Sequence, residues 1–302
     1  MISYDGLNNK LKEKCLTKSS LCNEIGISSR TIARMSKGEK ISDRVMEKIA
    51  VYLSCAPEEL YREISSNALL QTLRDEKAIK LSGGIYHELQ VRMTYNSNHI
   101  EGSRLSEDQT RMIFETNTVD VGKGVPVDDI IETANHFRAI YYVIDTAEKP
   151  LNEVIIKELH RILKQSTRDS ALDWFAVGDY KRRANTVGGK KTASPSDVHA
   201  KMELLLSDYE SKKIITVEDI IEFHYNFEKI HPFQDGNGRV GRLIALKECL
   251  RFNIVPFIIE DSKKVFYYRG LSEWENERGY LTDTCLDGQD TFISIMKMFD
   301  IA

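Results

Sequence analysis

The stretch His231–Arg242, HPFQDGNGRVGR, places a short glycine-rich loop between a His-Pro pair and two arginines. A helical pattern of apolar residues precedes it over residues 216–230, and another follows over residues 238–252. Pro232 disfavours helical geometry for the residue before it, so we expect His231 to end the first helix with its side chain directed outward. The loop then leads directly into the N-terminus of the second helix.

A glycine-rich loop at a helix N-terminus presents consecutive backbone N–H groups and is a typical anion site. Arg239 and Arg242 fall in the first turn of that helix, where cations oppose the helix dipole. A polyphosphate explains this unfavourable placement, because guanidinium groups bind phosphate oxygens bidentately. Asp235 suits the single carboxylate ligand of a Mg²⁺ ion that bridges phosphates. His231, beside that anion, is suited to take a proton from an attacking hydroxyl.

The stretch resembles the Fic family signature, His-x-Phe-x-Asp-Gly-Asn-Gly-Arg-x-x-Arg, at every specified position. The resemblance covers roughly residues 85–300 and implies an all-α core with a β-hairpin flap. It also implies transfer of AMP from ATP, with Mg²⁺, to a Ser, Thr or Tyr hydroxyl of a target protein. By the same resemblance His231 is the general base, Asp235 holds Mg²⁺ and Phe233 anchors the loop. The residues implied for phosphate binding are Gly236, Asn237, Gly238, Arg239 and Arg242.

Residues 184–193, ANTVGGKKTA, carry two short β-prone runs around a Gly-Gly pair and predict a β-hairpin. The edge of such a hairpin is free to pair with an extended segment. The resemblance assigns Thr186, Val187, Gly188 and Gly189 to the flap, which pairs with the target by β-augmentation. Gly178-Asp179-Tyr180-Lys181 leads into it, where many relatives have Gly-x-Tyr-Arg.

A second motif, Ser97-Asn98-His99-Ile100-Glu101-Gly102, ends a helix that we expect over about residues 84–101. Ser97 and Glu101 are four residues apart and share a face of that helix. The motif resembles the inhibitory Ser/Thr-x-x-x-Glu-Gly/Asn motif of the family. The implied partner of Glu101 is Arg242, whose guanidinium would otherwise contact the γ-phosphate.

Three ring residues near the signature have competing interpretations. Tyr267 and Tyr268 are candidates for the wall of a nucleoside pocket, although tyrosines at helical spacing more often pack in a core. His224 lies seven residues before His231, and we interpret it as a packed core histidine.

Residues 1–64 predict a small helix-turn-helix domain. Thr17, Ser28 and Ser42 are placed to cap helices, and Gly26 supplies a left-handed turn between two of them. These residues carry 11 Lys and Arg against 9 Asp and Glu, and the second helix, about 29–37, contains Arg30 and Arg34. The pattern resembles the phage-repressor-like helix-turn-helix family, so we expect DNA binding through these two arginines. A helical bundle for protein contacts is the alternative.

The composition of the whole chain suits a protein of two domains. It has 302 residues, of which 41% are hydrophobic and 29% charged. We expect the helix-turn-helix domain in residues 1–64, a joint near residues 65–68, and the Fic-type domain in residues 65–302. The apolar runs are too short for a membrane span, and five scattered cysteines without a CxxC pair favour the cytoplasm.

The leading interpretation is an autoinhibited protein adenylyltransferase, for which self-modification is also considered. One alternative is the removal of AMP, with Glu101 positioning water. Another is a transcription regulator that only senses nucleotide, although such a sensor has no need of the base His231. Transfer of a different phosphorylated group, such as phosphocholine, fits the two arginines less well. The target protein, any DNA operator and the existence of a homodimer are left open by the sequence.

Overall fold

The computed structural model describes residues 2–36, 39–63, 67–120 and 124–301. The chain divides into two compact units, Met1–Gln71 and Thr72–Ala302, and each is described by itself. The expected joint at 65–68 falls partly outside the described residues, as does Lys37 at the end of the expected second helix. Among the described residues, no helix combines the length and apolar character that a membrane crossing requires.

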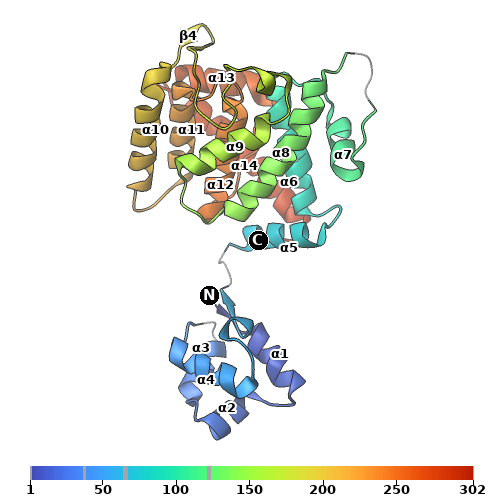
Figure 1. Ribbon diagram of the computed structural model, residues 1–302, viewed down its shortest axis with the longest axis vertical. Coiled ribbons are helices and arrows are strands. Elements are labelled where there is room, and N and C mark those ends of the chain that lie inside the picture. The colour runs from blue at the N-terminus through green and yellow to red at the C-terminus, as the bar shows by residue number, and fades with distance from the viewer. Residues whose placement is uncertain (1, 37–38, 64–66, 121–123, 302) are drawn as a thin grey trace. The chain divides into compact units, whose positions relative to one another are not determined.

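The first unit is a small helical bundle with a two-stranded sheet (Figure 1). Thr17 caps α2 by accepting a hydrogen bond from the Ser20 backbone N–H. Gly26 then adopts φ 66° and turns the chain into α3, as expected for a helix-turn-helix. The elements are β1 (Ile2–Ser3), α1 (Asp5–Glu13), α2 (Lys18–Ile25), α3 (Ser29–Ser36), α4 (Asp43–Leu53), η1 (Pro57–Glu59) and β2 (Arg62–Glu63).

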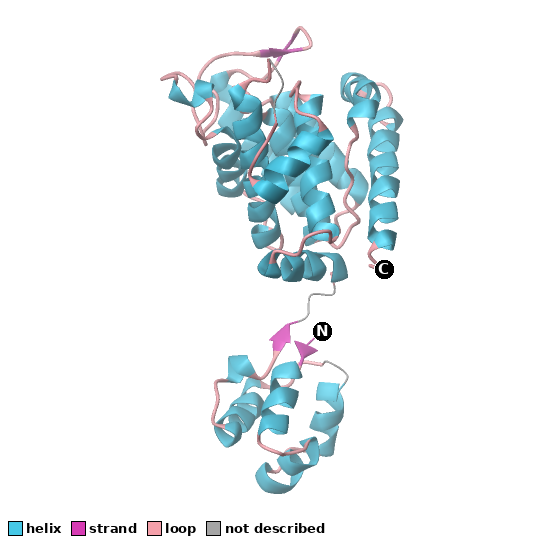
Figure 2. Cartoon of the chain, turned by 90° about the vertical axis from the view of Figure 1, so that its right-hand side faces the viewer, coloured by secondary structure: helices cyan, strands magenta, loops and turns pink. Residues whose placement is uncertain are grey.

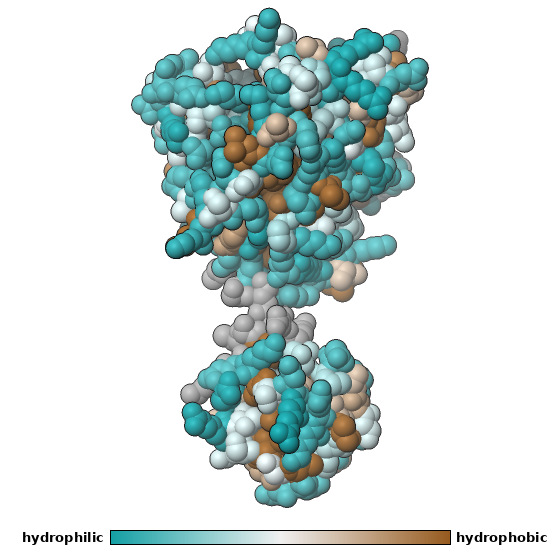
Figure 3. Space-filling view, turned by 60° about the vertical axis from the view of Figure 1, so that its left-hand side comes forward, coloured by the Kyte–Doolittle hydropathy of each residue, from teal (hydrophilic) through white to brown (hydrophobic). Residues whose placement is uncertain are grey.

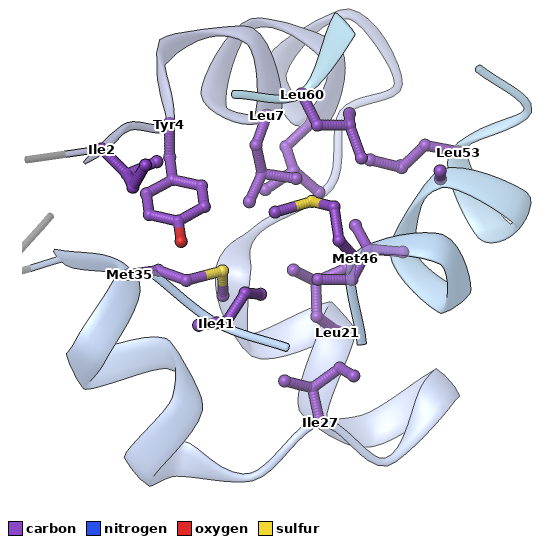
Figure 4. Close-up of a cluster of buried hydrophobic side chains, with 13 residues drawn as sticks. Ile2, Tyr4, Leu7, Leu21, Ile27, Met35, Ile41, Met46, Leu53 and Leu60 are labelled. Carbon is purple, nitrogen blue, oxygen red and sulfur yellow. The ribbon is translucent and has the colours of Figure 1, made fainter. Parts of the chain in front are cut away.

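This unit has its own hydrophobic core (Figure 4). Its completely buried residues include Leu7 of α1, Leu21 of α2 and Leu60 directly after η1. The antiparallel pairing of β1 with β2 joins the two ends of the unit. The sheet of β1 and β2 was not predicted from the sequence, because strands of two residues are too short to show an alternation of polar and apolar residues.

The second unit is built from helices, as the larger body of Figure 1 shows. Helix α5 (Ala68–Ile79) crosses the division between the units. The remaining elements are α6 (Ile85–Ile100), α7 (Glu107–Thr116), α8 (Val127–Thr146), α9 (Glu153–Lys164), η2 (Arg168–Ala171), α10 (Pro195–Glu210), α11 (Val217–Ile230), α12 (Asn237–Arg251), η3 (Asp261–Lys263), α13 (Lys264–Glu273) and α14 (Gly279–Met298).

Helix α12 is the centre of the second unit. It packs against α6, α8, α9 and α11, and all of its residues except Arg251 are buried. Its low amphipathicity follows from this position, because a helix that is surrounded on all sides has no solvent face. The loop before α12 is therefore held by a rigid core. In contrast, hydrophilic residues cover most of the face of this unit that Figure 3 shows.

The predicted hairpin is present between α9 and α10. Strands β3 (Thr186–Val187) and β4 (Lys190–Lys191) pair antiparallel, with Thr186 opposite Lys191. Gly188 and Gly189 form the two-residue connection with φ values of 56° and 77°. A type I′ turn requires positive φ at both central positions, which explains the Gly-Gly pair. Both strands are exposed, at one end of the unit (Figure 2).

Candidate functional site

His231 ends α11 in a left-handed conformation, with φ 54°. Its backbone N–H donates to the Phe227 carbonyl at 2.9 Å, which closes the last turn before Pro232. The imidazole is mostly buried, with 16% of the side chain exposed. Burial, and next the charge of Lys181, lower the pKa of His231 to about 4. The ring is therefore neutral at physiological pH, as a proton acceptor must be.

The loop after His231 is shaped by Phe233 and Asn237. Phe233 is completely buried and stacks on the His160 ring, with 4.0 Å between the ring centroids. The Asn237 side chain accepts from the Phe233 backbone N–H at 2.8 Å and donates to its carbonyl at 2.9 Å. Asn237 thus shapes the loop through its side-chain amide. These two hydrogen bonds explain the asparagine at this position even when no phosphate is bound. Gly236, with φ 79°, is the N-cap residue directly before α12.

A network of four charged residues, of which Asp235 is half-exposed, surrounds the base of the loop. Lys164 Nζ donates to Asp235 Oδ2 at 2.6 Å and also bonds Glu132. Arg239 pairs with Glu132 and approaches Asp235 Oδ2 at 3.4 Å. Burial disfavours the ionised Asp235 carboxyl, but Arg239 and Lys164 outweigh burial and hold its pKa well below the usual range. Asp235 is thus a carboxylate held in place, with 49% of its side chain exposed.

The structure brings the expected inhibitory residues onto Arg242. Nη2 of Arg242 donates to Glu101 Oε1 at 2.7 Å and to the Ser97 carbonyl at 2.9 Å. Nε donates to Ser97 Oγ at 3.0 Å. Burial opposes the charged guanidinium, but Glu101 more than compensates and raises the pKa of Arg242. Arg242 is therefore charged at every physiological pH.

The Glu101 carboxylate also lies against the first turn of α12. A Cβ atom at Gly238 would clash with Glu101 Oε1, so only glycine lets the carboxylate approach this closely. A carboxylate at a helix N-terminus interacts favourably with the helix dipole. Glu101 itself follows the last residue of α6, and Gly102 after it has φ 98°. The expected anion site at the start of α12 thus has an anionic side chain of the same chain at its edge.

The two tyrosines after the signature have different surroundings. Tyr267 is completely buried, and its hydroxyl lies 2.8 Å from His224 Nε2 and 3.3 Å from Arg242 Nη1. His224 is buried, as expected of a core histidine. Tyr268 is 42% exposed and donates to the Ile100 carbonyl at 3.2 Å. Only Tyr268 of the two is accessible to a nucleoside in this conformation.

Lys181 holds the base of the hairpin beside His231 through hydrogen bonds of its ammonium group. Its buried Nζ donates to Asn185 Oδ1 and Thr192 Oγ1, both at 2.7 Å, and lies 3.5 Å from the Ile230 carbonyl. Burial lowers the pKa of Lys181 to about 8. Thr186, Val187, Gly188 and Gly189 extend outward from this fastened base. The lysine thus fills the place where arginine is common in Gly-x-Tyr-Arg.

Lys164, Glu132 and the bonds of Lys181 were not identified from the sequence. A lysine at the end of the apolar face of residues 153–164 was the available signal for Lys164. Its partners Glu132 and Asp235 are 32 and 71 residues away in the chain, so no local pattern relates them.

The residues at the loop fit a Mg²⁺ ion that arrives with phosphates better than a preformed metal site. Within the described part of the chain, no three His, Cys, Asp or Glu side chains are grouped to hold a metal. Mg²⁺ commonly takes one or two carboxylates and completes its coordination with water and substrate phosphates. The half-exposed carboxylate of Asp235 meets that requirement.

In the first unit, the two arginines expected to bind DNA differ in their surroundings. Arg30 is exposed near the start of α3. Arg34 donates to Glu39 Oε2 at 2.9 Å and to the Lys40 carbonyl at 2.7 Å. An exposed ion pair of this kind contributes little free energy.

Comparisons with known proteins agree with this architecture. Residues 150–249 match the model of the Fic/DOC family, and residues 6–64 match that of the Cro/C1-type HTH DNA-binding domain. A solved Fic domain containing signaling protein from Bacteroides thetaiotaomicron has a TM-score of 0.61 and 26% identity, over 76% of this chain and 92% of that one. The predicted fold class is thereby confirmed.

Two curated relatives are both named protein adenylyltransferase Fic. The one from Drosophila persimilis is 32% identical over 190 residues, which are 61% of this chain and 36% of that protein. The one from Aedes aegypti is 29% identical over 184 residues, which are 60% of this chain and 36% of the relative. The chain thus spans little more than a third of the length of these relatives.

Proposed function

From the Fic domain that this chain carries after a Cro/C1-type helix-turn-helix domain, we propose a protein adenylyltransferase held inactive by Glu101. It transfers AMP from ATP to a Ser, Thr or Tyr hydroxyl of a target protein, or of the enzyme itself. The observation that carries this proposal is the convergence of His231, the α12 N-terminus and Arg242 on one loop, with Glu101 already bound to Arg242.

In the reaction, the N-terminal turn of α12 and Arg242 hold the triphosphate. Backbone N–H groups of Gly236, Asn237 and Gly238 face phosphate oxygens, and the helix dipole favours the anion. Arg239 faces the same anion from its pair with Glu132. Asp235 would hold Mg²⁺ together with the phosphates, and the ion would supply further neutralisation of charge.

His231 acts on the hydroxyl rather than on the nucleotide. Its neutral imidazole accepts the hydroxyl proton while the oxygen attacks the α-phosphorus of ATP, and the bond from that phosphorus to pyrophosphate breaks. The low pKa of His231 keeps the ring available at neutral pH. Tyr268, the accessible tyrosine, contributes to the nucleoside pocket, with Tyr267 behind it.

Glu101 inhibits by occupying Arg242. While that guanidinium is paired, it cannot hold the γ-phosphate, so the triphosphate takes an unproductive path. A displacement of about 1 Å at the reacting atoms can cost 10²-fold in rate. Removal of the carboxylate, or its movement away from Gly238, opens the site.

The exposed hairpin is proposed to receive an extended segment of the target. Thr186 and Val187 offer backbone groups at the outer edge, and Lys181 holds the base close to His231. Main-chain pairing supplies affinity, while side-chain contacts select the target. A hydroxyl in the paired segment would then be presented to the imidazole.

The first unit is proposed to bind DNA through the exposed face of α3, including Arg30 and Arg34. Its match to the Cro/C1-type model and its independent core support this second function.

The test of the proposed reaction compares the wild type with Glu101→Gly using α-labelled ATP, Mg²⁺ and a lysate. We expect Glu101→Gly to label protein and the double variant Glu101→Gly/His231→Ala not to. No label under any condition would refute AMP transfer, and AMP removal that is lost with Glu101 would favour the reverse reaction. Omitting Mg²⁺, and replacing Asp235 with Ala, tests the metal assignment in the same assay.

A further inference from the structure

Glu228 is a buried carboxyl group behind His231 that the proposed reaction does not use. It lies on α11 one turn before His231, and its side chain is 12% exposed. Oε2 of Glu228 is 3.8 Å from Nδ1 of His231. Among the described residues, neither Glu228 Oε1 nor His231 Nδ1 has a hydrogen-bond partner. Both side chains are buried and lie next to one another, and each has a polar atom that makes no hydrogen bond, which requires an explanation.

The space for Glu228 is provided by Gly241 on α12. A Cβ atom at Gly241 would come within 3.0 Å of Glu228 Oε1 and 2.8 Å of His224 Nδ1. Any larger residue at this position would push the carboxyl away from its place beside the imidazole. The glycine lies between Arg239 and Arg242 and is not a specified position of the signature. The position of Glu228 is thus determined by packing against α12.

We propose that Glu228 is a positioning residue for His231: its carboxylate accepts the Nδ1–H of the imidazole and leaves Nε2 free to take the target's proton. The catalytic role of this contact rests on the proposed function. The contact between Glu228 and His231 itself does not depend on that function. The gap of 3.8 Å is longer than a hydrogen bond and closes by rotation of the Glu228 side chain. An acid behind the base both selects the tautomer and stabilises the imidazolium that forms.

The other groups that face Glu228 explain why the contact is open in this structure. Burial, and then the nearby charge of Glu101, raise the pKa of Glu228 to about 8, while Arg242 opposes the rise. Glu228 is then largely protonated at neutral pH and accepts poorly. Loss of Glu101 removes one anion and frees Arg242, which favours ionised Glu228. The titratable groups that face this carboxyl are His231 and His224 of α11, Glu101 after α6, Arg242 of α12 and Tyr267 of α13.

The backbone carbonyl of Glu228 is the competing partner for Nδ1. It also favours the protonated imidazole, and it is retained in every variant of the Glu228 side chain. If the carbonyl alone orients His231, changes to the carboxyl leave the tautomer unaffected. This difference makes the two explanations separable.

The first experiment measures the tautomer without any nucleotide. Nitrogen NMR of the histidines in the full chain, with His231 assigned from the spectrum of His231→Ala, compares Glu101→Gly with Glu101→Gly/Glu228→Gln. We expect the Nδ1–H form of His231 in the first and a shift towards the Nε2–H form in the second. An unchanged tautomer overturns the proposal, whether or not the protein transfers AMP.

The second experiment measures transfer. In the Glu101→Gly background, Glu228→Gln should lower kcat roughly 10²-fold, the lower end of the range for acid–base catalysis, with the KM for ATP within about twofold. In the wild-type background, where Glu228 is largely protonated, the same change should have a smaller effect. Glu222→Gln, on the same helix and paired with Arg278 at the surface, is the matched control.

Equal kcat in Glu101→Gly with and without Glu228→Gln would also overturn the proposal. If no variant transfers AMP while the tautomer shifts as expected, the proposed function fails and the positioning contact stands. Should Glu228→Gln not fold, Glu228→Asp retains the charge and withdraws it by one methylene. Its kcat must then fall while its Tm stays near that of the parent.

Discussion

Arg242 and Glu101 form an ion pair of 2.7 Å between the second turn of α12 and the residue after α6, 141 residues apart in the chain. Ser97 completes the arrangement by bonding the same guanidinium through its hydroxyl and its carbonyl. Because Arg242 is buried, removal of one charge of this pair alters the electrostatics of the whole loop. On the proposed function, Glu101 is therefore the residue whose substitution should raise activity.

We expect Glu101→Gly to raise AMP incorporation about 10²-fold, because the freed guanidinium lets the triphosphate extend into a productive path. Glycine directly after α6 costs the helix at most about 1 kcal/mol, and Arg242 keeps its hydrogen bonds to Ser97, so we expect the fold to survive. Incorporation into the enzyme and into lysate proteins measures the effect.

Arg242→Ala is the control for this prediction, and it should be inactive with or without Glu101. Equal incorporation by the wild type and Glu101→Gly would remove autoinhibition from the account.

His231→Ala should lower transfer in the Glu101→Gly background by about 10²–10⁴, while the affinity for ATP changes little. The imidazole acts on the attacking hydroxyl, whereas the loop and the arginines hold the nucleotide. Label incorporation and equilibrium binding of ATP separate the two effects. His199→Ala, at an exposed histidine of α10, is the control and should transfer normally. Retention of full transfer by His231→Ala would assign the base to another residue.

The parts of the fold that the sequence predicted are those with local causes. Thr17 and Ser28 accept from the backbone N–H three residues ahead, and Gly188-Gly189 closes a two-residue turn. Each of these is decided by residues that lie within one turn of each other, so the pattern is readable in the chain itself.

The site residues that the sequence did not predict depend on distant contacts. Arg239 meets Glu132 across 107 residues, and Lys164 meets Asp235 across 71. The charge of a lysine marks no position as buried, and burial with a partner is decided only when α8, α9 and α12 pack. The pairing of Ser97 and Glu101 with Arg242 was expected because a resemblance, rather than a local pattern, related the two motifs.

Lys164→Met should lower the free energy of unfolding of the second unit by about 3 kcal/mol. Lys164 is 4% exposed and bonds both Glu132 and Asp235, so its removal leaves two carboxylates against one arginine, Arg239. Denaturant titration measures the change. Lys157→Met on the same helix, where the pairs are nearer the surface, should cost less than about 1 kcal/mol. Equal losses of unfolding free energy in the two variants would show that the ion pairs of Lys164 contribute no more than those of Lys157.

The first unit should bind DNA with an affinity that falls steeply as salt rises. Phosphate contacts release counterions, so each contact adds to the salt dependence. Gel shifts of residues 1–71 with random DNA and with upstream promoter DNA measure the salt dependence. The fragment can be used alone because this unit has its own core. Arg30→Ala should weaken binding more than Arg44→Ala on α4. Absence of binding even at low salt would favour a protein partner for this unit.

The second unit should lose stability as the pH falls from about 6.5 towards 3. Burial lowers the pKa values of His136, His160 and His224 to about 3, and that of His231 to about 4. The unfolded chain therefore binds more protons than the folded one in this range, and the free energy of unfolding decreases with decreasing pH. The raised pKa of Glu228 acts oppositely, and the stability it contributes is lost as the pH rises through about 8.

A histidine variant separates this effect from the carboxylates. His136 bonds only Thr94 Oγ1 within the described residues, at 3.0 Å, and His136→Gln offers an uncharged group in its place. Between pH 6 and 4, the variant's free energy of unfolding should fall with pH less steeply than the wild type's, by about 1.4 kcal/mol per pH unit, which corresponds to one proton. Denaturant titrations of both proteins at pH 6, 5 and 4 measure the two slopes. His199→Gln, at the exposed histidine of α10, should retain the wild-type slope. Parallel slopes for wild type and His136→Gln would mean that His136 is already protonated in the folded protein, against the burial that surrounds it.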